Sequence, residues 1–96
     1  MIAVNSEPDL GTVAALMNEA TTCMLMRQPV TCQHPAGWTR PENWPLPILR
    51  EPAAADGTVT QTYRPLAVLE WCEYRLGEPE RQARAARQAR AARMHA

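Results

Sequence analysis

The stretch between residues 29 and 47, PVTCQHPAGWTRPENWPLP, limits the fold more than any other part of the chain, because it contains five prolines. Proline lacks the backbone N–H and fixes φ, so no long helix can run through this stretch. We expect an irregular crossing segment here, with Trp38 and Trp44 covering one edge of the core. A chain of 96 residues has room for one small domain with one core, and the crossing segment separates its two halves.

The first half begins with helix signals. The sequence SEPDL supplies a capping serine, a proline suited to a first turn and an aspartate that favours a helix N-terminus. An apolar stripe follows at i, i+3, i+4 and i+7, formed by Leu10, Val13, Ala14 and Met17. Two interpretations are open. In one, a single helix covers about residues 9–27. In the other, residues 18–20 form a turn and a second short helix ends near Gln28. Thr21 or Thr22 would cap that second helix, and the whole would be a helix-turn-helix.

The second half is predicted to contain a β-hairpin and a helix. A short strand is expected over Ile48 to Glu51, and Asp56-Gly57 is a strong turn signal. Residues 58–63 alternate between threonines and larger side chains, which is typical of a strand. Pro65 then begins a helix that Gly77 ends. The expected core consists of Val13, Met17, Ile48, Val68, Trp71 and Cys72, with Trp44 as a lid.

The end of the chain reads RQARAARQARAAR over residues 81–93, with five arginines at a constant three-residue interval. The formal net charge of the whole chain is zero. Residues 1–80, however, carry five arginines against all ten acidic residues, and residues 81–93 carry five arginines against none. The Arg/Ala-rich composition of residues 81–93 favours a helix. The asymmetry predicts an acidic body with a basic extension and suggests an electrostatic partner.

The order of these elements resembles a small winged helix. The segment WPLPILRE, a glycine-containing hairpin and the segment YRPLAVLEWCEYRLGE are similar to the second half of excisionase-type winged-helix proteins. The DNA-binding domains of phage terminase small subunits look similar too, including a charged helical extension. The resemblance covers roughly residues 10–78. It implies an α+β fold: a winged helix-turn-helix with a two-stranded wing over residues 9–78, preceded by a flexible N-terminus over residues 1–8. A basic helical extension over residues 79–96 would follow.

The resemblance also implies a set of DNA-binding residues. In such proteins the recognition helix contacts base edges, and the matching positions here are Thr21, Thr22, Arg27 and Gln28. The wing lies over the DNA backbone, where Arg50, Thr60 and Arg64 would contact phosphates. The extension would add phosphate contacts from Arg81, Arg84, Arg87, Arg90 and Arg93. The alternative is that the extension is only a solvated helix.

Other chemistries have little support in the sequence. Cys32 and His34 form one loosely spaced pair, whereas structural zinc sites bring two close pairs, so we expect no metal and no cofactor. No glycine-rich phosphate loop or nucleophile with a placed base is present, which predicts a protein that is not an enzyme. No apolar run approaches the length of a membrane span, and the N-terminus does not read as a signal peptide. We therefore expect a cytoplasmic protein with three reduced, buried cysteines.

Two functional hypotheses follow. The first is a DNA-binding protein of phage or mobile-element type that acts on double-stranded DNA as an architectural factor, a packaging factor or a regulator. The second is a small phage-type interaction protein whose acidic body occludes a phage or host protein. The acidic body favours the second hypothesis, because a DNA-binding face is usually basic. A homo-oligomer is compatible with either.

Overall fold

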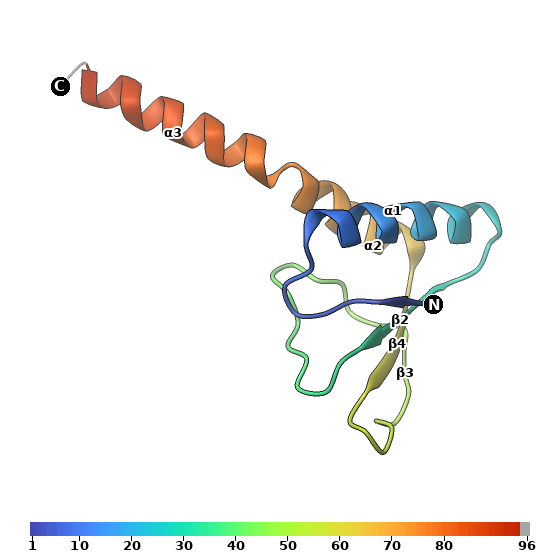
Figure 1. Cartoon of the computed structure of the whole chain (residues 1–96). Coiled ribbons are helices and arrows are strands. Elements are labelled where there is room, and N and C mark those ends of the chain that lie inside the picture. The colour runs from blue at the N-terminus through green and yellow to red at the C-terminus, as the bar shows by residue number, and fades with distance from the viewer. Residues whose placement is uncertain (95–96) are drawn as a thin grey trace.

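The computed structural model describes residues 1–94 and shows a small α+β protein with a four-stranded mixed sheet. Helices α1 (Leu10–Leu25) and α2 (Pro65–Leu76) lie together on one side of the sheet, and helix α3 (Glu78–Met94) extends away from the body (Figure 1). The α+β class is therefore confirmed. The last two residues of the expected extension, 95–96, lie outside the described residues.

Helix α1 is a single continuous helix, so the alternative with a turn at residues 18–20 is wrong. The carboxylate of Asp9 caps its start by accepting a hydrogen bond of 2.7 Å from the backbone N–H of Thr12. The hydroxyls of Thr21 and Thr22 donate to backbone carbonyls one turn earlier within this helix, at 2.9 and 3.1 Å. Both threonines thus continue the helix instead of capping a second one. The helix stays unbroken because Ala20, inside the supposed turn, is fully buried and anchors that part of α1 in the core.

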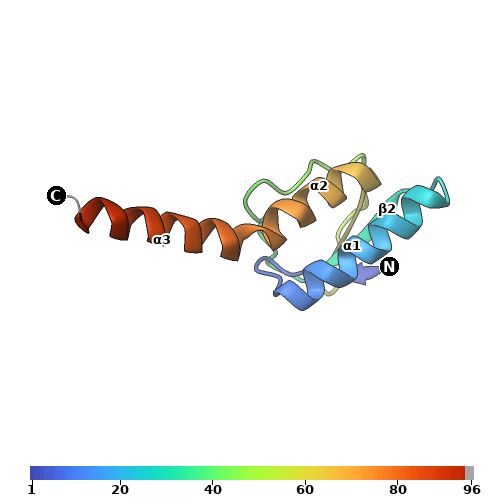
Figure 2. The same ribbon diagram turned by 90° about the horizontal axis from the view of Figure 1, so that it is seen from above.

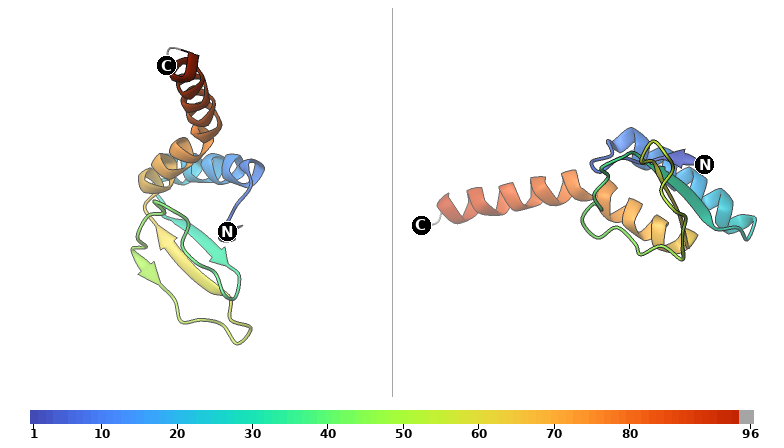
Figure 3. Two further views of the ribbon diagram at one scale, coloured as in Figure 1. Left: turned by 90° about the vertical axis from the view of Figure 1, so that its left-hand side faces the viewer. Right: turned by 90° about the horizontal axis from the view of Figure 1, so that it is seen from below.

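The sheet has the strand order β1-β2-β4-β3. Strand β2 (Val30–His34) pairs in parallel with β1 (Ile2–Ala3) and antiparallel with β4 (Val59–Tyr63), which also pairs antiparallel with β3 (Leu49–Arg50). The left view of Figure 3 shows the larger strands beneath the helices.

Two expectations about the sheet were wrong. Residues 30–34 form strand β2 although the whole stretch from Pro29 to Pro47 was expected to be irregular. The prolines at 29 and 35 flank this strand and do not interrupt it, so its ladder of hydrogen bonds is intact. Residues 1–8 were expected to be flexible, yet they contribute strand β1 and the fully buried Val4, whose N–H donates to the carbonyl of Gln33 at 2.9 Å.

The predicted hairpin is confirmed, with Leu49 opposite Thr62 in β4. Its first strand is shorter than expected and covers only two residues. At the tip, the carboxylate of Asp56 accepts a hydrogen bond of 2.9 Å from the N–H of Thr58. Gly57 has φ +85°, and a Cβ there would lie 2.8 Å from the Cβ of Ala36. Glycine is therefore required at this turn both by its backbone conformation and by the close approach of the crossing segment.

The core lies between the two helices and the sheet. Of the expected core residues, five are buried, namely Val13, Trp44, Val68, Trp71 and Cys72. Met17 is partly buried against them. The prediction for Ile48 is wrong, since its side chain is 53% exposed. Ile48 comes just before the edge strand β3, where few side chains are available to cover it.

An aromatic cluster closes the end of the core under the crossing segment. His34 stacks on Trp38 with ring centroids 3.8 Å apart, and Trp44 meets the edges of Tyr63 and Trp71 at 5.4 and 4.7 Å. The indole N–H of Trp71 donates to the carbonyl of Glu42 at 2.9 Å, which ties the crossing segment to α2. The expectation that Trp44 covers the core is thus confirmed. These edge-to-face contacts stabilise the fold beyond simple burial of area.

Candidate binding surfaces

Helix α3 is joined to the body by a short set of polar contacts. Arg75 near the end of α2 pairs with Glu78 at 2.6 Å, across the junction at Gly77. The guanidinium of Arg81 lies over the ring of Tyr74, 4.1 Å from its centroid. Together these contacts set the direction in which α3 leaves the body, as Figure 2 shows from above.

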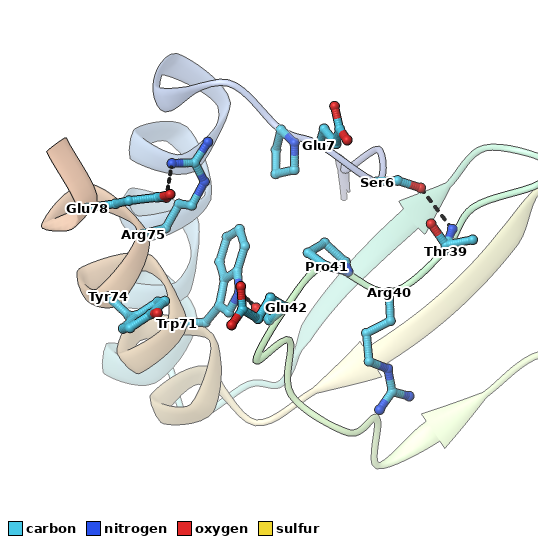
Figure 4. A pocket seen from close by; sticks show the side chains of 11 residues that line it. Ser6, Glu7, Thr39, Arg40, Pro41, Glu42, Trp71, Tyr74, Arg75 and Glu78 are labelled. Atoms are coloured by element: carbon cyan, nitrogen blue, oxygen red, sulfur yellow. Dashed lines mark hydrogen bonds and ion pairs between the residues drawn. The ribbon is translucent and has the colours of Figure 1, made fainter. Parts of the chain in front are cut away.

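A cavity of about 500 Å³ lies beside this junction, between α2, the residues before α1 and the crossing segment. The indole of Trp71 and the ring of Pro41 line it, and the Arg75–Glu78 pair stands at its edge (Figure 4). The hydroxyl of Ser6 accepts a hydrogen bond of 2.8 Å from the N–H of Thr39, which fastens the crossing segment to the N-terminal segment. The cavity therefore borders the junction between α2 and α3.

The five arginines of α3 differ in what they contact. Arg81 is stacked on Tyr74, and Arg84 pairs with Glu80 at 3.7 Å, with both side chains largely exposed. Within residues 1–94, Arg87, Arg90 and Arg93 make no salt bridge. Successive positions three residues apart are displaced by about 60° around a helix and about 4.5 Å along it. These three arginines therefore occupy about one third of the circumference of α3 and form a compact, exposed basic surface.

A second surface lies at the other end of the body. A groove of about 410 Å³ is formed where α1 ends, α2 begins and the chain enters β3. Its lining residues are mostly apolar, with two arginines and one glutamine: Met24, Arg27, Gln28, Pro29, Ile48, Arg64, Pro65 and Leu66. We call this surface the α1/α2 groove. Figure 2 shows the end of α1 and helix α3 on opposite sides of the body.

The residues predicted to bind DNA therefore do not form one surface. The structure brings Arg27, Gln28 and Arg64 together, but around a largely apolar groove. Thr21 and Thr22 are exposed on α1 with their hydroxyls hydrogen-bonded to the helix backbone. Two further positions lie on the sheet, and the remaining five lie on α3. Arg50 is exposed on the edge strand β3, and Thr60 is paired with Gln33 and half-buried.

The cysteines and the buried histidine have environments that oppose charge. Burial raises the pKa of the Cys32 thiol to about 12 and that of Cys72 to about 11, and it also raises the pKa of Cys23. All three are thus neutral thiols near pH 7, whereas a nucleophilic or metal-binding cysteine must ionise. Among residues 1–94, no three histidine, cysteine or acidic side chains are grouped as metal ligands would be.

The imidazole of His34 is fully buried and hydrogen-bonded on both sides. Its Nδ1–H donates to the carbonyl of Val4 at 2.8 Å, and its Nε2 lies 2.9 Å from the hydroxyl of Tyr63. That hydroxyl lies 2.7 Å from Oε1 of Gln61. Burial lowers the pKa of His34. From the sequence, His34 was considered only for a metal site, which the loose spacing from Cys32 argued against; its position in β2 makes it a structural residue of the aromatic cluster.

The α1/α2 groove was not predicted from the sequence. Ile48 was assigned to the core, and Met24 and Leu66 were not assigned to any site. The available signal was the run of apolar residues at the end of α1, MLM at residues 24–26, which continues past the point where the buried stripe ends.

No protein-family model, curated protein or solved structure matches this chain. In the described part of the chain, no helix combines the length and apolar character that crossing a bilayer requires.

Proposed function

We propose that the protein binds double-stranded DNA through helix α3, in a role that is architectural or regulatory and not enzymatic. The observation that carries the proposal is the exposed surface of Arg87, Arg90 and Arg93, whose guanidinium groups have no acidic partner among residues 1–94. Duplex DNA presents a phosphate charge about every 1.7 Å along its axis. A projecting helix with arginines on one side can therefore follow the backbone of the duplex.

The charge distribution supports this assignment to α3. The body, residues 1–77, carries eight acidic residues against five arginines, so its net charge is negative and opposes the approach of a polyanion. The arginines of α3 are the source of attraction, and α3 extends away from the acidic body (Figure 1). Contacts with phosphates fix position on the duplex but carry little sequence information. We therefore expect α3 to supply affinity without sequence preference.

The winged-helix interpretation is a narrower form of the same proposal. In it, the exposed end of α1, with Thr21 and Thr22, faces base edges, and the β3–β4 hairpin acts as the wing. Because α1 is one helix, such binding would use α1 itself without a preceding helix-turn unit. This form predicts a sequence preference that α3 alone would not give.

The test compares two triple variants in an electrophoretic mobility-shift titration with a random 30-base-pair duplex. In the first, Arg87, Arg90 and Arg93 are replaced by glutamine, which keeps helix propensity but removes charge. In the second, the same three residues are replaced by lysine, which keeps the charge. The glutamine variant should bind more weakly, and the slope of log affinity against log salt should fall by about 2.7, or about 0.9 for each lost phosphate contact. The lysine variant should keep the slope.

Equal affinity and equal salt slope for the parent and the glutamine variant would overturn the proposal. Loss of binding in both triple variants would contradict it as well, because then the geometry of arginine and not its charge would matter. Circular dichroism of both variants confirms that α3 remains helical.

A further inference from the structure

We propose that the α1/α2 groove is a docking site for a segment of a partner protein in which apolar side chains adjoin carboxylates. This inference goes beyond the proposed binding of DNA, and it concerns the end of the body opposite α3 (Figure 2).

The apolar part of the groove is formed by three large side chains from three separate segments. Met24 at the end of α1, Ile48 before β3 and Leu66 in the first turn of α2 are 43%, 53% and 59% exposed. Pro29 and Pro65 complete the walls with rigid rings. Three further exposed apolar residues are next to lining residues in sequence, namely Leu25, Met26 and Leu49. Exposed apolar surface that gathers in one place marks an interaction site more often than scattered single residues do.

The charged part of the groove is wholly positive. Arg27 and Arg64 line it, and none of its eight lining residues is acidic. Neither arginine takes part in a salt bridge within residues 1–94. In a chain whose body is acidic, this combination selects for an occupant that carries carboxylates.

The start of α2 adds a third positive element. Arg64 is the N-cap residue of α2, and its side chain makes no capping hydrogen bond. The first backbone N–H groups of a helix lack partners within it and carry partial positive charge. Pro65 has no N–H and the N–H of Val68 donates to the carbonyl of Arg64 at 3.2 Å, so Leu66 and Ala67 supply these groups. Because Pro65 and Leu66 line the groove, a carboxylate of the occupant would lie near this turn and the side chain of Arg64.

The conformation of Arg27 is a further observation. It has φ +56° just after α1, where the N–H of Gln28 donates to the carbonyl of Cys23 at 2.8 Å. Glycine is preferred in this position because a Cβ is unfavourable in the left-handed region. An arginine there is not explained by backbone stability, and its side chain lines the groove. Such a side chain can pair with a carboxylate of the occupant.

Nucleic acid is a less suitable occupant than a protein segment. Five of the eight lining residues are apolar, and a phosphate backbone would cover them without gaining from their burial. An amphipathic protein segment uses both kinds of lining residue, because its apolar side chains fill the groove while its carboxylates meet the arginines.

The test starts from a library of random 12-residue peptides, displayed on filamentous phage and selected against the full chain. We expect the selected peptides to be enriched in aspartate or glutamate beside leucine, isoleucine, methionine or aromatic residues. The most frequent peptide is then synthesised, and its affinity is measured by isothermal titration calorimetry against the parent and three variants.

Leu66→Asp should weaken binding by about tenfold or more. The new carboxylate would remove an apolar contact from the groove and repel the carboxylate of the peptide. Arg64→Gln should weaken binding and reduce its dependence on salt. Leu10→Asp is the matched control, since Leu10 is an exposed leucine in the first turn of the other helix, α1. It should leave the affinity unchanged. Leu66 is exposed and near a helix N-terminus, where aspartate is tolerated. Equal melting temperatures of the two aspartate variants would verify that neither substitution unfolds the protein.

Three results would overturn the proposal. The first is selected peptides without acidic enrichment, or peptides that bind Leu66→Asp as well as Leu10→Asp. The second is a dimer of the parent chain that Leu66→Asp dissociates, which would make a second copy the occupant. The third is weaker binding of duplex DNA by Leu66→Asp than by Leu10→Asp, which would make the groove a nucleic-acid surface. The first two results involve no DNA, so they are independent of whether α3 binds it.

Discussion

Helices α1 and α3 have nearly equal lengths, 16 and 17 residues, but they are stabilised in different ways. Helix α1 buries Val13, Leu16, Ala20 and Cys23 against α2 and the sheet, whereas no residue of α3 is buried. Isolated helices shorter than about 12–15 residues are marginal in water even when rich in alanine, and most helices in proteins are stabilised by tertiary packing of one face. Helix α1 is therefore held by tertiary packing, and α3 must depend on its own composition.

Local interactions make up for the missing packing of α3. Acidic residues occupy its first turn and Arg93 its last, which matches the polarity of the helix. Glu78 accepts from Gln82 at 3.3 Å as well as from Arg75, and Glu80 pairs with Arg84. Exposed pairs of this kind contribute only a few tenths of a kcal/mol each. The buried apolar residues of the chain thus lie in the body, and the side chains of α3 remain exposed for contacts with other molecules.

The largest expected effect is the loss of an aromatic side chain from the body. Trp71→Ala removes a buried indole that contacts Trp44 and donates to the crossing segment. The free energy of unfolding should fall by about 3–5 kcal/mol, as measured by urea denaturation followed by circular dichroism. Gln88→Ala in α3 is the control and should leave the urea midpoint unchanged. An unchanged midpoint for Trp71→Ala would show that the indole is not part of the core.

The next largest effect on stability is expected from an alanine-to-glycine substitution, made once in α1 and once in α3. Ala20→Gly in α1 should destabilise the body by about 1–2 kcal/mol, because it loses helix propensity and a buried methyl group. Ala86→Gly in the exposed α3 should lower helicity by circular dichroism without moving the cooperative urea transition. If Ala86→Gly moved that transition as far as Ala20→Gly, α3 would be packed on the body, and the contrast between the two helices would be wrong.

The smallest expected effect is a dependence of stability on pH that arises in the body. Burial holds the pKa of His34 below its ordinary value of 6.5, so the folded state favours the neutral imidazole. The unfolded chain therefore binds more protons as pH falls through 6.5. The stability that depends on neutral His34 is complete above that pH and is lost as pH falls toward the lowered folded pKa. Calorimetric melting temperatures should decrease between pH 7.5 and about pH 5.5. An increase over that range would indicate that the folded state favours the charged imidazole.

Much of the fold could be predicted from patterns that act locally. The hairpin followed from the alternation after Gly57, helix α2 from Pro65 and Gly77 at its two ends, and α3 from its Arg/Ala composition. The buried side of α1 was harder to predict. Its buried residues are Val13, Leu16, Ala20 and Cys23. Of the predicted stripe, Val13 is buried and Met17 partly buried, whereas Leu10 and Ala14 are exposed, because the small residues Ala20 and Cys23 give little hydrophobic signal for the buried side.

The elements that were missed depend on pairing between distant segments. Strand β1 covers two residues and exists only because β2 lies beside it. Strand β2 is recognisable as Val30, Cys32 and His34 alternating with polar residues, but the prolines around it suggested irregular structure. The α1/α2 groove is formed by three segments far apart in the sequence, and no local pattern brings Met24, Ile48 and Leu66 together. The arginines of α3, in contrast, form one contiguous repeat and could be selected directly.

The aromatic cluster also determines what intrinsic fluorescence can detect in this protein. All three tryptophans lie in the body, at positions 38, 44 and 71, and residues 78–96 contain no tryptophan or tyrosine. Each indole is within 6.3 Å of another aromatic ring, measured between centroids. Tryptophan emission therefore reports the packing of the body and does not report the conformation of α3 directly. When a ligand contacts only the arginines of α3, a change in tryptophan emission reports transmission through the junction, where Arg75 pairs with Glu78 and Arg81 stacks on Tyr74.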